Sequence, residues 1–355
     1  MLDQRITKVK VAFGFMVLLF VSAIVFAVSE HAARSLTFAV EQELRYLSYR
    51  WEFNENGAST LAGAYGFITN PLNATVNTET ATEAVPVLVY HRIPKEADGA
   101  NVTLDTFKEH LATLHDRGWQ TVTLADFHSF LRGEKTLPER SFVLTFDDGA
   151  RASYYPVDPL LRVFGYHAVT FILPQYSLHS KTTYYVSQDD LENMTDSGRW
   201  EIGSHGFDAH AHIPINSSGE EAPYLGNRAW LPQTESLESL HQFATRVEQD
   251  LERSKAELED ALGISVTAFA YPFGDFGQRS RNYAGAEAVL RATTVASYPI
   301  AFAQIDTETR SVISPLSGER GFMVRRLKVD PTWSGDDLIH EMGSIVNASS
   351  FPYRQ

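Results

Sequence analysis

The stretch Phe142-Val143-Leu144-Thr145-Phe146-Asp147-Asp148-Gly149 decides how this chain folds. Its first five residues form an apolar run of the length and composition typical of a buried strand. Two adjacent carboxylates and a glycine follow the run. Like charges this close raise the pKa of one carboxyl unless a cation balances them. The stretch therefore predicts a strand that ends in a cation site, with a helix-capping or turn role for the aspartates as the alternative.

A second segment supplies histidines that suit the same cation. Glu201-Ile202-Gly203-Ser204-His205 reads as a strand that ends in His205, and His210 follows after four residues. A lone histidine is more often structural, but two histidines together with the aspartate pair favour a divalent metal that keeps an open position for water. One aspartate would bind the metal while the other takes a proton from water. His212 is the alternative to His210, and Asp208 could orient an imidazole.

Strand-like and helix-like segments alternate from residue 85 onward. Helices are predicted from Thr103 to Gly118, over 151–164 and over 243–262. Strands are predicted over 86–90, 142–146, 168–173, 201–205 and 266–271. This alternation predicts an α/β fold with parallel strands, whose functional groups lie at the C-terminal ends of the strands.

Composition narrows the range of functions. The chain has 355 residues, a formal net charge of −14 and no cysteine. The acidic balance argues against nucleic-acid binding, which normally requires a basic face. Without cysteine, any protein-bound metal must use histidine, aspartate or glutamate.

The N-terminal region predicts a membrane anchor. Residues 11–28 are apolar and uncharged, and at about 1.5 Å each they would span roughly 27 Å, close to the thickness of a bilayer core. Arg5, Lys8 and Lys10 precede them, which predicts a cytoplasmic tail over 1–10 and the bulk of the chain on the periplasmic or extracytoplasmic side of the inner membrane. A cleaved signal peptide is the alternative. Residues 29–84 then form a helical stalk and linker, and 85–355 the catalytic domain.

Three motifs together resemble a known family. The TFDDG segment at 145–149, the EIGSH strand with its second histidine, and the AYPFG segment at 270–274 resemble the polysaccharide deacetylases of carbohydrate esterase family 4. PVLVYHRI at 86–93 further resembles the bacterial branch that deacetylates poly-β-1,6-N-acetylglucosamine. The resemblance runs from about residue 85 to 340. It implies a distorted (β/α) barrel with an Asp-His-His site for zinc, and sometimes for nickel or cobalt.

The resemblance also implies catalytic roles. Asp147 matches the general base, and the backbone N–H of Phe273 would help to hold the oxyanion. Tyr271 and Pro272 would form the wall of the substrate groove. The metal ligands would be Asp148, His205 and His210.

The chain departs from the family pattern at Ala270, where many members have an arginine that orients the base. Arg326 is the expected substitute for this base-orienting arginine and is placed among the substrate-site residues, and a solvated basic pair with Arg325 is the alternative. The general acid is expected at His340, although the surrounding DDLIHEM segment has a helical pattern. His91 could contact the substrate or pack as a polar residue at the end of its strand.

The sequence thus predicts metal-dependent N-deacetylation of an N-acetylglucosamine-containing exopolysaccharide, a biofilm polymer, with release of acetate. Residues 213–235 would form a rim on which Tyr224 and Trp230 stack on sugars, with ordinary loop packing as the alternative. The expected partners are the N-acetylated polysaccharide, the membrane, and polysaccharide synthase or export machinery. The alternative functions are an O-acetyl esterase acting on an acetylated glycan and an inactive polysaccharide-binding protein.

Overall fold

A computed structural model describes residues 81–82, 84–180, 182–305 and 323–349 of the chain. The predicted cytoplasmic tail and anchor, and nearly all of the predicted stalk, lie outside these ranges. Across the described ranges, no helix combines the length and apolar character that a bilayer crossing needs. The anchor therefore stays a prediction from the sequence.

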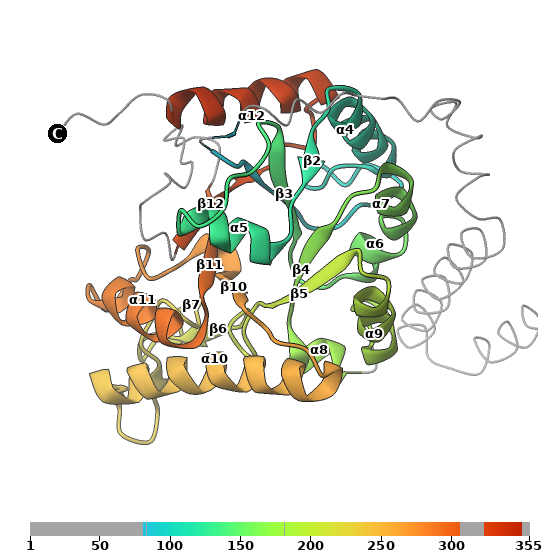
Figure 1. Ribbon diagram of the computed structural model, residues 1–355. Coiled ribbons are helices and arrows are strands. Elements are labelled where there is room, and N and C mark those ends of the chain that lie inside the picture. Colours follow the sequence, from blue (N-terminus) through green and yellow to red (C-terminus); the bar gives the residue numbers. More distant parts are fainter. Residues whose placement is uncertain (1–80, 83, 181, 306–322, 350–355) are drawn as a thin grey trace, which may run out of the picture. The chain divides into compact units, whose positions relative to one another are not determined.

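Parallel strands close into a barrel (Figure 1). The strand order is β1-β12-β11-β10-β5-β4-β3, and the pairing of β1 with β3 closes the ring. A further short strand, β2, pairs with the first residues of β3. The strands are β1 Val87–Tyr90, β2 Gln120–Thr121, β3 Ser141–Phe146, β4 Ala168–Ile172, β5 Trp200–Ser204, β10 Ala268–Ala270, β11 Ile300–Ile305 and β12 Met323–Lys328. The predicted α/β class with parallel strands is confirmed, and the barrel is of the kind that the resemblance implied.

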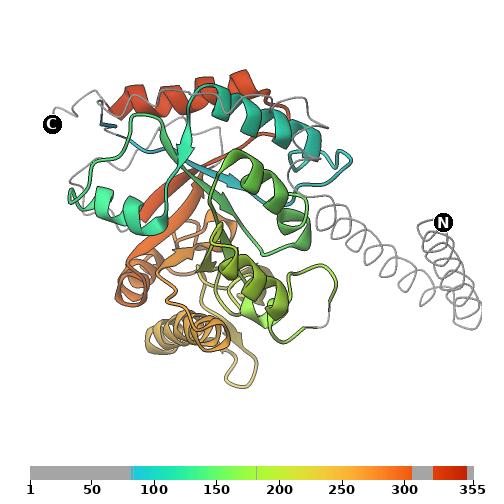
Figure 2. The same cartoon turned by 45° about the vertical axis from the view of Figure 1, so that its right-hand side comes forward.

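The helices follow the strands and cover the outside of the barrel. In both views α12 lies beside α4, and α10 runs along another side of the molecule (Figure 1 and Figure 2). The helices are α4 Leu104–Asp116, α5 Leu124–Leu131, α6 Arg151–Tyr154, α7 Asp158–Phe164, α8 Pro174–Ser177, α9 Gln188–Asp196, α10 Leu240–Leu262, α11 Ala286–Ser297 and α12 Gly335–Ser349, with the 3-10 turn η1 Pro272–Gly274.

Local chemistry sets the ends of the long helices. The Thr103 side chain accepts a hydrogen bond from the Thr106 N–H and so caps α4, as predicted. Helix α10 begins three residues before the predicted start, because Ser239 and Gln242 form a reciprocal capping box. The single helix predicted over 151–164 is wrong. The chain forms α6 and α7 with a break at 155–157, where Pro156 has no N–H to continue the first helix.

Alternation along the strands separates two hydrophobic clusters. Leu88 and Leu144 point outward, into the cluster that the surrounding helices share. Val87 and Val143 point inward, into a second cluster that also contains buried residues of α5. The Leu124 N–H donates to the Glu201 carboxylate near the start of β5, which places α5 at the N-terminal end of the barrel. The opposite mouth, where the strands end, is left for polar groups.

The same alternation determines which polar side chains enter that mouth. A side chain two residues beyond an inward-facing position points inward as well. Counting from Val89, Thr145 and Gly203 reaches the polar residues that directly follow β1, β3 and β5, and counting from Val324 reaches a polar residue within β12. These residues are His91, Asp147, His205 and Arg326.

Candidate metal and catalytic site

Asp147 is buried in the barrel mouth and forms an ion pair with an arginine. Its side chain is 3% exposed, and Arg326 Nη1 and Nη2 donate to its Oδ1 and Oδ2, each at 2.6 Å. Arg326 Nη1 also donates to Thr145 Oγ1 at 3.2 Å, and the guanidinium lies 5.2 Å from the centre of the Phe171 ring. This two-pronged contact fixes the carboxylate in one orientation.

The Asp148 side chain points in a different direction from Asp147 because the backbone adopts a left-handed conformation at Asp148. Asp148 has a φ of 71°, and Gly149 follows with a φ of 67°. An aspartate in this left-handed conformation costs on the order of 1–2 kcal/mol. A Cβ on Gly149 would lie 2.7 Å from Ile172 Cδ1, so the turn also needs a residue without a side chain. The strained turn points the Asp148 carboxylate away from Asp147 and toward the loop that follows β5.

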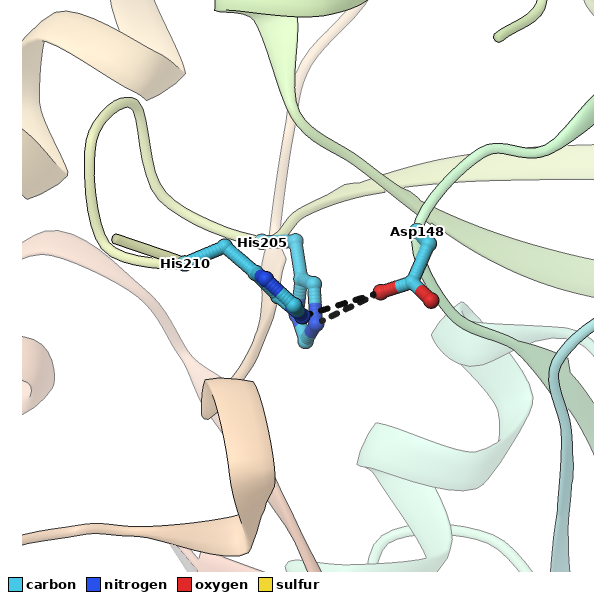
Figure 3. Close-up of side chains that lie close together, drawn as sticks. All are labelled: Asp148, His205 and His210. Atoms are coloured by element: carbon cyan, nitrogen blue, oxygen red, sulfur yellow. Dashed lines mark ion pairs between the residues drawn. The ribbon is translucent and has the colours of Figure 1, made fainter. Parts of the chain in front are cut away.

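Two imidazoles meet Asp148 there (Figure 3). Asp148 Oδ1 lies 3.5 Å from His205 Nε2 and 3.4 Å from His210 Nε2. His205 comes directly after β5, and its N–H donates to the Ile172 carbonyl at 2.8 Å. These are the three residues that the sequence predicted as cation ligands, and one ligand atom from each lies within 4.8 Å of the others. His212, the alternative ligand, is exposed and lies outside this set.

The donor atoms of this set fit a divalent cation. The His205 Nδ1 donates to the Ala270 carbonyl at 2.8 Å, so in the neutral ring Nε2 carries a lone pair. That lone pair faces Asp148 Oδ1, which is buried and has no hydrogen-bond partner among the described residues. Two acceptors that face one another in this way suit a cation bound between them. Tetrahedral ligands about 2.1 Å from a zinc ion are about 3.4 Å apart, and the two Asp148–histidine distances are 3.4 and 3.5 Å.

Neighbouring charges keep both aspartates ionised. Burial acts to raise the pKa of Asp147, but the Arg326 guanidinium outweighs it and the pKa is lowered. Burial also acts to raise the pKa of Asp148, and the His205 imidazole outweighs it. The pKa of His205 is raised in turn, because the two carboxylates outweigh its burial. Neither aspartate shows the upward pKa shift expected of a bare pair, since Arg326 lies beside Asp147 and His205 lies beside Asp148.

His91 is a third imidazole in the mouth. Its Nε2 lies 4.0 Å from Asp147 Oδ2, and its side chain is 30% exposed. Burial lowers the pKa of His91, although Asp147 and Asp148 act to raise it. Of the two readings of the sequence, polar packing or substrate contact, this geometry favours contact with a molecule in the mouth.

The AYPFG segment divides into an exposed and a buried part. Phe273 has a φ of 59° and is 37% exposed, and its ring centre lies 4.4 Å from that of His210. Tyr271 is 1% exposed and its hydroxyl donates to Thr294 Oγ1 at 2.8 Å. Pro272 is buried as well. Of this segment, only the Phe273 side chain is exposed enough to form the expected groove wall, while the side chains of Tyr271 and Pro272 are buried and cannot contact a substrate.

Two further expectations need correction. His340 lies on the exposed face of α12, and none of the hydrogen bonds or ion pairs of the site just described includes it. The helical pattern of the sequence around His340 argued against its assignment as the general acid, and this segment does form helix α12. Arg326 is 1% exposed, so it cannot bind substrate directly. Its two-pronged contact with Asp147 confirms the prediction that it takes the place of the arginine missing at position 270, and the alternative of a solvated pair with Arg325 is excluded.

The segment expected to form a rim folds into two small hairpins. Strands β6 His212–Pro214 and β7 Glu221–Pro223 form the first, and β8 Trp230–Leu231 and β9 Ser236–Leu237 form the second. Tyr224 and Trp230 are both only partly exposed. The Tyr224 ring lies 4.3 Å from the Arg246 guanidinium, so it packs on α10.

The sequence reading missed residues that contact this site through the backbone. Asp208 does not orient an imidazole; the Ala270 carbonyl does that for His205. The Asp208 N–H instead donates to Asp250 at 2.6 Å. Tyr184 is 38% exposed, and its carbonyl accepts from the Arg151 N–H beside the Asp148 turn. No local sequence pattern marks Asp250 or Tyr184, because each contacts the site from a distant part of the chain.

Comparison with known proteins bears on the family and the fold of the chain. Residues 134–289 match the family model described as polysaccharide deacetylase. Poly-β-1,6-N-acetyl-D-glucosamine N-deacetylases of Escherichia coli K12 and Staphylococcus epidermidis are 26% and 25% identical, over 201 and 182 residues. The matches cover 52% and 51% of this chain, but only 30% and 56% of the relatives, so the chain spans a fraction of their length.

Among solved structures, a de-N-acetylase from Aggregatibacter actinomycetemcomitans is similar with a TM-score of 0.60 and 22% identity. The similarity covers 72% of this chain and 99% of that one, and at this identity it supports the fold. From the barrel, the family match and these relatives, the chain carries a polysaccharide deacetylase domain of carbohydrate esterase family 4, homologous at modest identity to poly-β-1,6-N-acetyl-D-glucosamine N-deacetylases.

Proposed function

We propose that this chain is a metal-dependent N-deacetylase of an N-acetylglucosamine-containing polysaccharide. The observation that carries the proposal is the unpartnered Asp148 Oδ1 facing His205 and His210 beside the Asp147–Arg326 pair. This combination supplies a cation site and a base held ionised next to it. The names of the relatives support the class of substrate.

Asp148, His205 and His210 would hold the cation, which when bound lowers the pKa of water and polarises a carbonyl oxygen. The donor chemistry supports zinc, with nickel or cobalt as alternatives.

The residues of the chain then divide the reaction between them. Asp147 takes a proton from the attacking water, and Arg326 keeps the carboxylate ionised and in one orientation. The new C–O bond forms at the acetamide carbonyl carbon, and the backbone N–H of Phe273 helps to stabilise the oxygen that becomes negative. When the C–N bond breaks, the sugar nitrogen takes a proton and acetate leaves. We assign this proton donor to His91, in place of His340, because it is partly exposed at the mouth and 4.0 Å from Asp147. Burial lowers its pKa, so His91 would pass on the proton that Asp147 takes from the water.

The proposed location is the extracytoplasmic side of the cytoplasmic membrane. It is supported by the apolar, uncharged residues 11–28 and the basic residues before them. A polymer that leaves the cell would meet the domain there, and synthase or export machinery would be its neighbour.

Acetate release by the purified full-length chain in detergent tests the proposal. We expect release from β-1,6-linked N-acetylglucosamine oligomers, loss of release in a chelator, and its return when zinc is added. Acetylated xylan serves as the comparison substrate. Release from xylan alone would indicate an O-acetyl esterase, and release that survives complete removal of metal would contradict the metal-dependent mechanism.

A further inference from the structure

The loop between the two histidine ligands doubles back on itself. Only four residues, Gly206 to Ala209, separate His205 from His210, yet both imidazoles reach Asp148 Oδ1. Gly206 has a φ of 84°, and a Cβ on it would lie 2.2 Å from the Ala209 Cβ. A loop this tight has few internal hydrogen bonds, so its N–H groups need partners elsewhere.

Those partners come from helix α10. The Phe207 N–H donates to Asp250 Oδ1 at 3.1 Å, and the Asp208 N–H donates to Asp250 Oδ2 at 2.6 Å. The Phe207 ring also lies beneath Arg253, whose guanidinium carbon is 3.4 Å from the ring centre. Both oxygens of one carboxylate are thus used to hold successive residues of the ligand loop.

A second contact to the same helix holds the start of the loop. The Gly206 N–H donates to Ser204 Oγ at 3.2 Å, and Ser204 Oγ lies 2.7 Å from Ser254 Oγ. Ser254 follows Asp250 by one helical turn, so both face the loop from one side of α10. Three successive N–H groups are therefore fixed to one rigid element.

Burial of the Asp250 carboxylate is energetically unfavourable. Asp250 is 5% exposed and lies next to Leu251 on a buried helix face that is apolar apart from Asp250 and Ser254. Burial raises the pKa of Asp250 to about 6, although the two backbone N–H groups act in the opposite direction. An apolar residue would avoid this cost but would leave both N–H groups without partners.

We infer that Asp250 is a positioning residue that holds His205 and His210 at the spacing one divalent cation requires, with Ser254 supporting it through Ser204. The inference rests on the proposed function, since it concerns the cation that the proposed reaction uses. Asp250 touches neither the cation ligands' imidazoles nor the mouth, and it acts only through the loop backbone.

The test is zinc binding by the full-length chain carrying Asp250→Asn. An asparagine keeps the shape but turns an NH2 group toward one of the two N–H donors, so one hydrogen bond is lost. We expect the zinc dissociation constant, measured by competition with a chromophoric chelator, to increase about 10- to 100-fold. This is the range for groups that orient metal ligands. Acetate release should fall at limiting zinc and recover at saturating zinc.

Helix α10 provides a matched control. Glu259 Oε1 accepts the Val266 N–H at 2.9 Å, a similar contact made away from the ligand loop. Glu259→Gln should leave zinc affinity unchanged. Ser254→Ala, which removes only the supporting hydroxyl, should weaken zinc binding by about 2- to 10-fold, the equivalent of one hydrogen bond. The Ser254→Ala variant still tests the positioning role if Asp250→Asn does not fold.

The outcomes separate the two proposals. If the unmodified chain binds no zinc, the proposed function fails and this inference fails with it. If the unmodified chain binds zinc and folded Asp250→Asn binds it equally well, only the positioning role is overturned. Equal weakening by Glu259→Gln would also overturn it, because the effect would then reflect general destabilisation of α10. In the Co²⁺-loaded protein, an altered absorption spectrum in Asp250→Asn alone would support the role directly.

Discussion

Asp147 and Asp148 are neighbours in the chain and have opposite surroundings. Asp147 is 3% exposed and its two oxygens are held by Arg326 from β12. Asp148 is 21% exposed, and its Oδ1 has no hydrogen-bond partner in the described structure although two imidazoles face it. The left-handed backbone conformation of Asp148 separates the two carboxylates.

The difference shows how one strand end can supply two chemical roles. A carboxylate that is fully paired and oriented can act as a base, but it has little room to bind a metal. A carboxylate that is left without a hydrogen-bond partner beside two imidazoles is suited to bind a metal. The contrast predicts that substitutions on the two sides have separable effects.

The largest expected effect is on the Asp148 side. Asp148→Asn removes the only anionic ligand of the proposed set, so we expect zinc affinity to fall by more than roughly 100-fold, the upper range for groups that merely orient ligands. Activity should fall with it. Zinc titration followed by acetate release checks this. Tight zinc binding in the folded variant would exclude Asp148 as a ligand.

The next effect separates the base from the ligands. Asp147→Asn should lower kcat/KM by about 10²- to 10⁴-fold, the usual contribution of a positioned general base. Zinc stoichiometry should stay the same, because Asp147 is held by Arg326 and not by the cation set. Loss of zinc together with activity would mean that the two carboxylates do not have separate roles.

Removing the arginine should change both stability and pH dependence. Arg326→Gln leaves Asp147 buried without its charged partner, which typically costs about 3–5 kcal/mol. Burial then raises the pKa of Asp147 with nothing to oppose it as strongly. The base is therefore protonated at higher pH, and the acid limb of the kcat/KM profile should move upward.

The neighbouring Arg325 provides the control for this effect. It occupies the next position on β12 and so points to the other side of the sheet. Arg325→Gln should change unfolding free energy by no more than about 0.5 kcal/mol and leave the pH profile in place. Similar shifts from both variants would show that net charge, not the contact with Asp147, sets the pKa.

A smaller effect concerns the turn that separates the two carboxylates. Gly149→Ala should destabilise the fold by about 1–2 kcal/mol for the left-handed conformation, plus about 1–3 kcal/mol for the clash with Ile172. Gly165→Ala is a matched control, since Gly165 also has a φ of 67° but no atom within 4 Å of the added Cβ. Urea unfolding measures both. Equal losses would mean that the turn tolerates a side chain.

The smallest effect is expected at His340. His340→Gln should leave kcat and KM unchanged, because the residue lies on the exposed face of α12. His91→Gln should lower kcat, because His91 stands beside Asp147 in the mouth. Steady-state kinetics of the two variants compares the assignments, and a loss in His340→Gln alone would restore the acid predicted from the sequence.

Much of the fold follows from local patterns that the sequence displays. Buried strands such as β3 are continuous apolar runs, and the caps of α4 and α10 are set by residues next to them. Strand β12 was harder to recognise, because MVRRLKVD contains three charged residues in six strand positions. One of those charges, Arg326, is buried only because it meets Asp147 inside the barrel.

The sequence by itself determined the ligand types and the strand ends that carry them. An apolar run followed by two aspartates, and a strand followed by spaced histidines, are local features. Only the tertiary structure decided that Arg326, 179 residues from Asp147, becomes its partner and that Asp250 holds the ligand loop. The physical reason is that closure of the barrel places β1 between β3 and β12, and no local preference encodes which distant strands become neighbours.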